Sequence, residues 1–204
     1  MKYVKMLGLA VMAAVFMAIV GAATASATVI CENNLNTEKC SAPYAIGTKG
    51  TASVPAGSSV SLTNTANESL DTCTESTVTG VLKSQGAEKP ALSELSSITF
   101  GNCTFPTKTV NPGRGELTWI KGTDNGTLFT YETQATINTI FFGSCIYGVT
   151  GTDMGTTVGG NPGSLTVNAI VEKFSGSAFA CPSTAKLTGT YVATSPTNAW
   201  VSNG

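Results

Sequence analysis

The sequence predicts an all-β protein, a single antiparallel β-sandwich of about ten strands, jelly-roll or immunoglobulin-like and stapled by disulfides. Short segments rich in Thr and Val alternate with turn residues, and helical periodicity is almost missing. Charged residues make up only 11% of the chain, with Thr, Ser, Asn and Gly in their place. A surface solvated by hydroxyls and amides is typical of exported β-proteins.

The N-terminal segment predicts export. Lys2 and Lys5 form a short basic start, an apolar run covers 6–23, and residues 25–27 read Ala-Ser-Ala. This order is typical of a secretory signal peptide, so we predict a signal peptide over 1–27 and one mature domain over 28–204. We expect a secreted or cell-surface protein with no membrane span after cleavage. An uncleaved N-terminal membrane anchor is the alternative, because the run is almost long enough to span a bilayer.

The strands follow in chain order from apolar and β-branched segments bounded by turn residues. They are expected at 59–64, 70–73, 77–83, 95–100, 116–121, 128–137, 141–147, 164–172, 185–194 and 199–202. Residues 85–94 could hold a helical turn, which Pro90 limits. In 164–172 every second residue is apolar, and 185–194 alternates similarly. One buried face per strand favours an antiparallel sandwich over a parallel sheet.

One hairpin register can be predicted. Leu117 and Trp119 share a face of one strand, and Phe129 and Tyr131 share a face of the next. A three-residue loop at 124–126 pairs Trp119 with Tyr131 and brings the two apolar faces together. We therefore expect Trp119 and Tyr131 to be neighbours in the core.

The six cysteines should be oxidised in an exported protein. They contain no C-x-x-C pair, which argues against a zinc ribbon or a thioredoxin-type redox site. Sequence alone does not choose among the fifteen pairings, but spacing along the chain ranks them. The favoured structural disulfides are Cys31–Cys40, Cys73–Cys103 and Cys145–Cys181.

Composition excludes several functions. The chain has no histidine, so a Ser-His-Asp or Cys-His catalytic arrangement and an imidazole zinc site cannot form. Arg114 is the single arginine, and no basic cluster occurs. Eleven basic residues less the two lysines of the leader leave nine against twelve acidic ones, a mature net charge of −3. We therefore expect no nucleic-acid partner and no cofactor.

The predicted hairpin suggests a catalytic pair. It places Glu116 and Glu132 on one face as diagonal neighbours, the arrangement of two carboxylates that a glycosidase needs. The simpler interpretation is a solvated polar face shared with Thr118, Thr130 and Gln134. That interpretation is preferred, and no catalytic residue is assigned.

Two further sites were weighed. Asp124, Asn125 and Asp153 could ligate calcium, but no dense Asp-x-Asp loop accompanies them, and turn or capping roles are simpler, so no metal is expected. Trp200 could be an exposed anchor for a polysaccharide or a protein partner. A last strand tucked against the sandwich is the favoured alternative.

Several short sequence motifs resemble those of a known group of proteins. They are Cys-Ile-Tyr-Gly at 145–148, Thr-Asp-Met-Gly-Thr at 152–156, Gly-Gly-Asn-Pro at 159–162 and Cys-Pro-Ser-Thr-Ala at 181–185, with 191–196, 73–74, 76–80 and 98–100. Together they resemble a group of uncharacterised exported, β-rich proteins of soil actinobacteria. The resemblance implies an exported β-domain with disulfides, and it implies no activity and no site residues. Its paired cysteine phrases agree with the Cys73–Cys103 and Cys145–Cys181 bridges.

These observations favour a non-enzymatic protein of the cell envelope or extracellular space, a structural or binding module of unknown ligand. A cell-wall polymer or another surface protein is the expected partner. Two alternatives stay open. One is a small secreted carbohydrate hydrolase that uses the paired carboxylates. The other is a self-assembling surface subunit that pairs through exposed sheet edges.

Overall fold

The computed structural model describes residues 27–33, 40–87, 89–140 and 143–204. The predicted signal peptide therefore lies outside the described residues, apart from Ala27. The described residues form fourteen strands and no α-helix, and none of them belongs to a helix long and apolar enough to cross a membrane. The strands are β1 (Thr28–Cys31), β2 (Lys49–Ser53), β3 (Val60–Thr63), β4 (Ser69–Ser84), β5 (Ala91–Cys103), β6 (Thr107–Asn111), β7 (Arg114–Trp119), β8 (Gly126–Tyr131), β9 (Gln134–Thr139), β10 (Gly143–Gly148), β11 (Thr152–Val158), β12 (Ser164–Lys173), β13 (Thr184–Ser195) and β14 (Trp200–Asn203).

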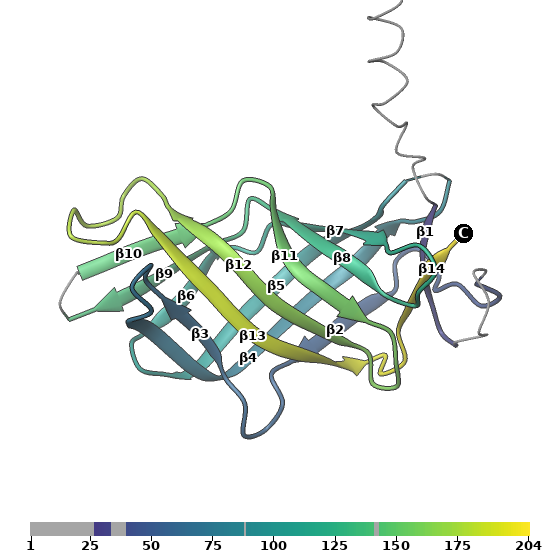
Figure 1. Cartoon of the computed structure of the whole chain (residues 1–204), viewed down its shortest axis with the longest axis horizontal. Coiled ribbons are helices and arrows are strands. Elements are labelled where there is room, and N and C mark those ends of the chain that lie inside the picture. Colours follow the sequence, from purple (N-terminus) through teal and green to yellow (C-terminus); the bar gives the residue numbers. More distant parts are fainter. Residues whose placement is uncertain (1–26, 34–39, 88, 141–142) are drawn as a thin grey trace, which may run out of the picture.

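The main sheet is a closed eight-stranded antiparallel barrel (Figure 1). Going around it, β2 pairs with β4, and β5, β7, β8, β11, β12 and β13 follow in that order. β13 then pairs with β2, which closes the ring. β3 pairs with the same two neighbours as β2, namely β4 and β13. The two strands therefore occupy one position in the ring, at different heights of the barrel wall. Neighbours in the ring are neighbours along the chain, so the barrel is an up-and-down meander.

Three extra strands lengthen the barrel wall at one end. β10, β9 and β6 form a run of antiparallel pairs that starts from β12. Each of them joins a ring strand across a short break, β6 to β7, β8 to β9, and β10 to β11. The hydroxyl of Thr109 in β6 donates to the backbone oxygen of Ile98 in β5, at 2.7 Å. The extension therefore lies between β12 and β5 and continues the enclosure.

The prediction of a β-sandwich is wrong, although the all-β class is confirmed. A strand of a barrel and a strand of a sandwich both alternate between a buried and an exposed face, so the pattern along a strand is the same for both. What distinguishes them is the pairing of β13 with β2 across the full length of the chain. That pairing leaves no trace in local periodicity.

The predicted strands were mostly present but misplaced at their ends. Segments 70–73 and 77–83 are one strand, β4, and 128–137 is divided into β8 and β9. Within the segment 85–94, where a helical turn was possible, residues 91–94 belong to β5 and the described residues before them form no helix. β1, β2, β6 and β11 were not predicted, because β1 is a short apolar run without alternation and the other three segments carry few apolar residues. The first two residues of the predicted 141–147 strand lie outside the described residues.

The hairpin between β7 and β8 has a different register from the predicted one. Trp119 pairs with Gly126 and Leu117 with Leu128, so the connection covers residues 120–125. Trp119 is buried as expected, at 7% exposure. Tyr131 is not its neighbour but pairs with Arg114, whose guanidinium lies 4.9 Å from the centre of the tyrosine ring. The longer loop holds itself together, since the Trp119 indole N–H donates to the Thr123 carbonyl at 2.6 Å.

A small two-stranded sheet lies at the opposite end of the barrel from β9 and β10 (Figure 1). It pairs β1 with β14, from Thr28 opposite Asn203 to Cys31 opposite Trp200. The Thr28 hydroxyl accepts a hydrogen bond from the backbone N–H of Trp119, at 3.0 Å. We call this sheet the cap. A second, smaller core of Leu82, Ala91, Leu117, Trp119 and Val201 joins it to the barrel.

The three predicted disulfides are confirmed. Cys31–Cys40 fastens the chain that follows β1, Cys73–Cys103 joins β4 to β5 at a register pair, and Cys145–Cys181 ties β10 to the loop after β12. No described cysteine is free. Three disulfides indicate an oxidising environment for the folded protein.

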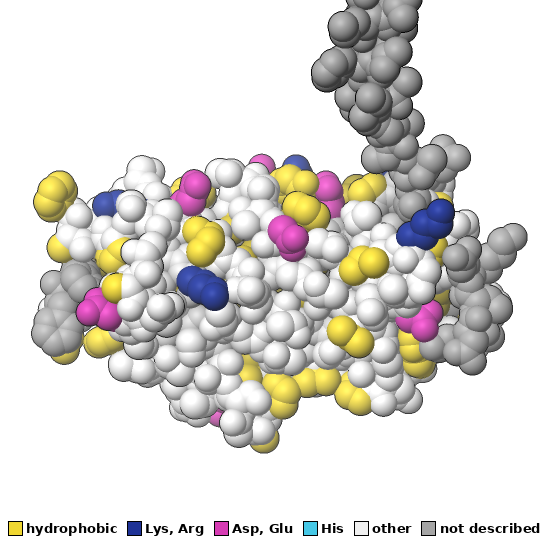
Figure 2. All heavy atoms as spheres, in the orientation of Figure 1, with side chains coloured by type: hydrophobic (Ala, Val, Ile, Leu, Met, Phe, Trp, Pro, Cys, Tyr) yellow, Lys and Arg dark blue, Asp and Glu magenta, His cyan; other side chains and the backbone are white. Residues whose placement is uncertain are grey.

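Charged residues make up 11% of the chain, and they are sparse on the face shown in Figure 2. The single ion pair among the described residues joins Lys83 to Glu94 at 2.7 Å, and both side chains are more than half exposed. This pairing lowers the pKa of the Glu94 carboxyl. Hydroxyl pairs across neighbouring strands are more typical of this surface, such as Ser53 with Thr77 at 2.9 Å. The polar exterior contrasts with the apolar interior described below.

Gly113 sits at the break between β6 and β7 with φ +73°, a conformation that favours glycine. A Cβ at this position would lie 2.1 Å from the backbone oxygen of Tyr131. We expect Gly113→Ala to lower the free energy of unfolding by about 2–3 kcal/mol, since it adds both backbone strain and a clash with main-chain atoms. Urea unfolding followed by tryptophan fluorescence measures the change. Gly122→Ala has a similar φ of +79° with open space around its Cβ, so it should cost clearly less. Equal losses in the two variants would contradict the steric argument.

Candidate functional site: the barrel lumen

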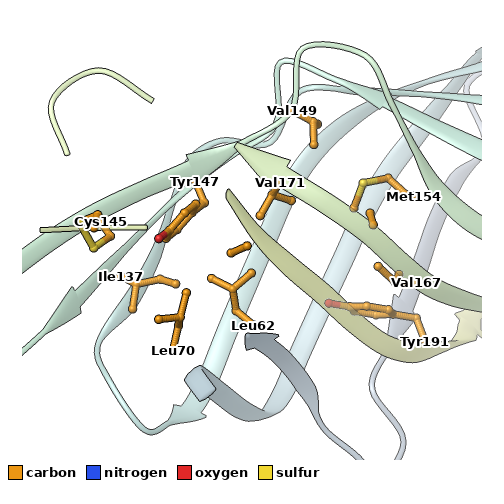
Figure 3. Close-up of a cluster of buried hydrophobic side chains, with 13 residues drawn as sticks. Leu62, Leu70, Ile137, Cys145, Tyr147, Val149, Met154, Val167, Val171 and Tyr191 are labelled. Atoms are coloured by element: carbon orange, nitrogen blue, oxygen red, sulfur yellow. A yellow bond between two sulfur atoms is a disulfide. The ribbon is translucent and has the colours of Figure 1, made fainter. Parts of the chain in front are cut away.

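The interior of the barrel encloses an apolar chamber with a cavity volume of about 160 Å³. We call it the inner chamber. Its walls come from nearly every strand of the barrel, so no single segment of the chain defines it. Figure 3 shows the cluster of buried hydrophobic side chains in this part of the barrel, and most of the residues that it labels line the chamber. The principal apolar residues are Leu62, Val78, Ile137, Val149, Met154, Val167, Val171 and Leu187.

A second chamber of about 260 Å³ lies between the barrel and the cap. We call it the outer chamber. Ile30 of β1 and Tyr44 line it from the side of the cap, and Pro196 and Ala199 line it from the segment before β14. The Tyr44 hydroxyl donates to the backbone oxygen of Asn198 at 2.8 Å, which joins these two segments. The cap therefore forms one wall of the outer chamber.

Three residues line both chambers, namely Val78 of β4, Leu95 of β5 and Leu128 of β8. The inner and outer chambers therefore meet at these three residues. All three side chains are aliphatic and only partly buried. Because they line the chambers, the exposed part of each side chain faces the lumen. The two chambers together reach the lower end of the range of roughly 300–1,000 Å³ that is usual for small-molecule sites.

Asp71 is the one charged residue in the described part of the chain that lines either chamber, and it is 3% exposed. Its carboxylate accepts hydrogen bonds from the backbone N–H groups of Thr72, at 2.8 Å, and Phe105, at 3.0 Å. It also accepts one from the Thr107 hydroxyl. These bonds tie β4 to the start of β6. They account for the burial of this carboxylate, which would be costly without partners.

The two buried tyrosines of the lumen also have partners. The Tyr147 hydroxyl donates to the backbone oxygen of Pro182 at 3.0 Å, and burial raises the pKa of this phenol to about 12. The Tyr191 hydroxyl lies 2.9 Å from that of Ser76, which in turn donates to the backbone oxygen of Thr99. Burial raises the pKa of Tyr191 as well. Both phenols therefore stay neutral at physiological pH.

Thr130 of β8 differs from these residues. It lines the inner chamber and is 5% exposed. Its hydroxyl is the one buried side-chain polar atom of the described residues that has no hydrogen-bond partner. The sequence interpretation placed Thr130 on a solvated face beside Glu116, and that placement is wrong, because the observed register turns Leu128 and Thr130 into the lumen.

The suggested catalytic pair is not assembled as the hairpin predicted. Glu116 pairs with Phe129 across β7 and β8 and accepts a hydrogen bond from the Tyr131 hydroxyl at 3.1 Å. This bond is the main cause that raises the pKa of Tyr131. Glu132 lies in the break between β8 and β9 with φ +60°, outside the paired strands. The diagonal placement of Glu116 and Glu132 is therefore absent, and neither residue lines a chamber.

The residues weighed for calcium lie in turns and a strand. The Asn125 side chain accepts a hydrogen bond from the backbone N–H of Gly159 at 3.1 Å, and the Asp153 carboxylate accepts one from Gly155 at 2.9 Å. The backbone oxygen of Asp124 accepts one from Val201. These bonds fit the turn and capping roles preferred for these residues.

Trp200 is half-buried in β14, as the preferred interpretation of a tucked last strand requires. A Cβ on Gly159 would lie 2.7 Å from its indole ring, so the ring packs closely on that glycine. Trp200 lines neither chamber.

One cluster has the composition of a metal site. Asp71, Cys73 and Cys103 place their ligand atoms within 4.8 Å of one another. The two sulfur atoms are bonded to each other as a disulfide, so neither is a thiolate that could ligate a metal. The cluster is therefore structural.

Comparison with known proteins gives no relative, since no protein-family model, no curated protein and no solved structure matches the chain. The lumen therefore has to be interpreted from its own chemistry. The sequence interpretation missed it because its residues are spread over the barrel strands. The signal in the sequence was that Leu128 and Thr130, two residues apart in one strand, share a face. That face can be assigned to the lumen only when the register between β7 and β8 is known.

Proposed function

We propose that this protein is an exported, non-enzymatic binding protein that holds a small apolar molecule inside its barrel. The observation that carries the proposal is the apolar inner chamber inside a closed ring of strands, with its adjoining outer chamber. An eight-stranded barrel is just wide enough either to be filled by its own side chains or to hold one small ligand. This barrel leaves space, and hence belongs with the second kind.

The energetic cost of empty space supports the proposal. By the relation measured for cavities in protein cores, an empty volume of 160 Å³ costs about 4 kcal/mol. Single substitutions in the sequence would fill part of this space and reduce the cost, for example an exchange of Val78 or Val167 for a larger aliphatic residue. An apolar ligand that binds in the chamber recovers the lost contacts and stabilises the folded protein by mass action.

Export is part of the proposal. It is supported by the N-terminal pattern of basic, apolar and small residues, by the three disulfides and by the resemblance to exported proteins of soil actinobacteria. A molecule that is poorly soluble in water needs a carrier or a store outside the cell. A closed barrel with a polar exterior can hold such a molecule without membrane contact.

The two alternatives have less support. The hydrolase hypothesis depended on Glu116 and Glu132 as diagonal neighbours, a placement the register does not produce. The assembly hypothesis depended on long unpaired sheet edges, and closure of the ring between β13 and β2 leaves edges only at short strands, β6 of the extension and β1 and β14 of the cap. No observation favours either one over ligand binding.

The proposal is tested with the disulfide-bonded protein made from the full chain, so that the producing cell processes the leader. The probe is N-phenyl-1-naphthylamine, an uncharged dye whose fluorescence rises in apolar surroundings. We expect saturable binding of one dye per chain and a rise in the melting temperature with dye concentration. Native mass spectrometry of the untreated protein shows whether a ligand from the producing cell is already bound.

A pair of variants locates the dye. Val78→Phe adds a ring where the two chambers meet and should weaken dye binding by at least tenfold. Thr99→Phe adds the same ring on the exposed side of β5 and should leave binding unchanged. Absence of dye binding by the ligand-free protein, or equal binding by both variants, would show that the lumen is not a binding site.

A further inference from the structure

We infer that the ligand of the lumen is electrically neutral and carries a hydrogen-bonding group that pairs with the hydroxyl of Thr130. The ligand class is a neutral lipid-like alcohol, ketone or ester, rather than a fatty-acid anion or a pure hydrocarbon. This inference rests on the proposed function and adds to it the chemistry that selects the ligand.

The first argument is the state of the Thr130 hydroxyl. It is buried in the wall of the inner chamber and has no hydrogen-bond partner. A buried hydroxyl without a partner costs about 1–3 kcal/mol, so such groups are rare in folded proteins. The same β-branched shape without the hydroxyl is available as valine. A polar ligand atom at this place would satisfy the group and account for threonine.

The second argument is that the neighbouring polar groups are already occupied. Asp71 accepts three hydrogen bonds from its own surroundings. Tyr147 and Tyr191 have partners in Pro182 and Ser76. Thr130 is therefore the polar group of the chamber that is left for a ligand, and one polar group on the ligand is enough.

The third argument concerns charge. Among the residues that the structure describes, no lysine or arginine lines either chamber, and the chain has no histidine. An anion taken into the lumen would leave water without gaining a positive partner, and it would approach the carboxylate of Asp71. A carboxylate-bearing lipid is disfavoured for both reasons. A neutral polar group loses far less on desolvation and gains the Thr130 bond.

The test uses four probes with the same carbon chain, 1-octanol, 1-chlorooctane, octanoate and octylamine, each in competition with the naphthylamine dye at pH 7. Octanol should displace the dye at the lowest concentration, at least fivefold below chlorooctane and at least tenfold below octanoate. Octylamine tests whether Asp71 selects a cation. Tighter binding of octanoate or octylamine than of octanol, or equal binding of octanol and chlorooctane, would overturn the inference.

Thr130→Val separates a role in recognition from a role in structure. This variant should bind octanol at least fivefold more weakly while its affinity for chlorooctane, which has no hydroxyl to pair with Thr130, stays the same. It should also raise the melting temperature of the ligand-free protein, because it replaces an unpaired hydroxyl by a methyl group. Thr127→Val, on the same strand but outside both chambers, is the matched control and should not change the order of the probes.

The outcomes distinguish the two levels of the argument. Failure of the dye to bind would overturn the proposed function and this inference together. Dye binding with no preference for octanol, or an unchanged octanol affinity in Thr130→Val, would leave the binding function intact and remove the assigned ligand chemistry.

Discussion

Replacing Cys145 and Cys181 together by alanine should lower the free energy of unfolding by about 3–5 kcal/mol, the largest loss expected for any of the three disulfides. This bridge closes a loop with a sequence separation of 36, for which the chain-entropy relation gives about 4 kcal/mol. Both sulfur atoms are also buried within the main core cluster, at 2% and 4% residue exposure. Their removal therefore loses packing as well as the cross-link.

The structural consequence should be concentrated in the barrel extension. Cys145 lies in β10 and Cys181 in the loop between β12 and β13, so their bond holds that loop against the end of the barrel. The Tyr147 hydroxyl bonds Pro182, the residue that follows Cys181, and should lose that contact as the loop loosens. Hydrogen exchange should show faster opening of β9 and β10 than of β4 and β5.

Thermal and urea unfolding measure the effect, with a fall in the melting temperature of roughly 10 °C expected for a chain of this size. The matched control replaces Cys31 and Cys40 by alanine. That bridge has a sequence separation of 9, for which the same relation gives about 2.5 kcal/mol. A larger loss for this control than for the Cys145–Cys181 variant would show that loop length does not set the order.

The sequence was enough to predict the all-β class, the disulfides and much of the strand pattern, because these depend on local chemistry. The strand 164–172 is an example. Val167, Ala169 and Val171 are buried, while Asn168 and Ile170 between them are exposed. Alternation at period two reports which residues face inward. It does not report whether the sheet closes, so the barrel could not be distinguished from a sandwich.

The register of the β7–β8 hairpin shows a second limit. Matching apolar faces favoured Phe129 and Tyr131 as the inward residues, and both face the other way. Tyr131 stacks on Arg114 and bonds Glu116, contacts that make an aromatic ring stable outside the barrel. The resulting shift between β7 and β8 is five residues, an odd number, so it exchanges the two faces. The wrong register also affected the candidate site, because it placed Thr130 on the outer face of the strand and not in the lumen.

The candidate site as a whole was beyond sequence prediction for a physical reason. A motif can be recognised when a few neighbouring residues carry the chemistry, but the lumen is lined by one to three residues from each of many strands. Each of them, such as Leu62 or Val167, is an ordinary core residue in its own segment. Only closure of the ring turns these separate faces into one enclosed apolar wall, and closure is a property of the whole chain.

The lumen also depends on the buried carboxylate, and replacing Asp71 by leucine should lower the free energy of unfolding by about 3–4 kcal/mol. Leucine has the same branched shape and is larger than aspartate, so the substitution leaves no cavity and the loss includes that of the hydrogen bonds. The backbone N–H groups of Thr72 and Phe105 lose the acceptor that they share in Asp71. The Thr107 hydroxyl keeps an alternative acceptor, the backbone oxygen of Phe105 at 3.2 Å.

Asp71→Asn is the graded control, since its amide oxygen still accepts while its NH₂ group cannot, and it should cost about 1–2 kcal/mol. Urea unfolding of both variants, with a check that the slope is unchanged, gives the two values. The order follows from what the carboxylate does, which is to satisfy donors from two segments, β4 and the start of β6, inside an apolar wall. A leucine variant as stable as the parent would mean that desolvation of the carboxylate cancels these bonds, as it can for buried charges.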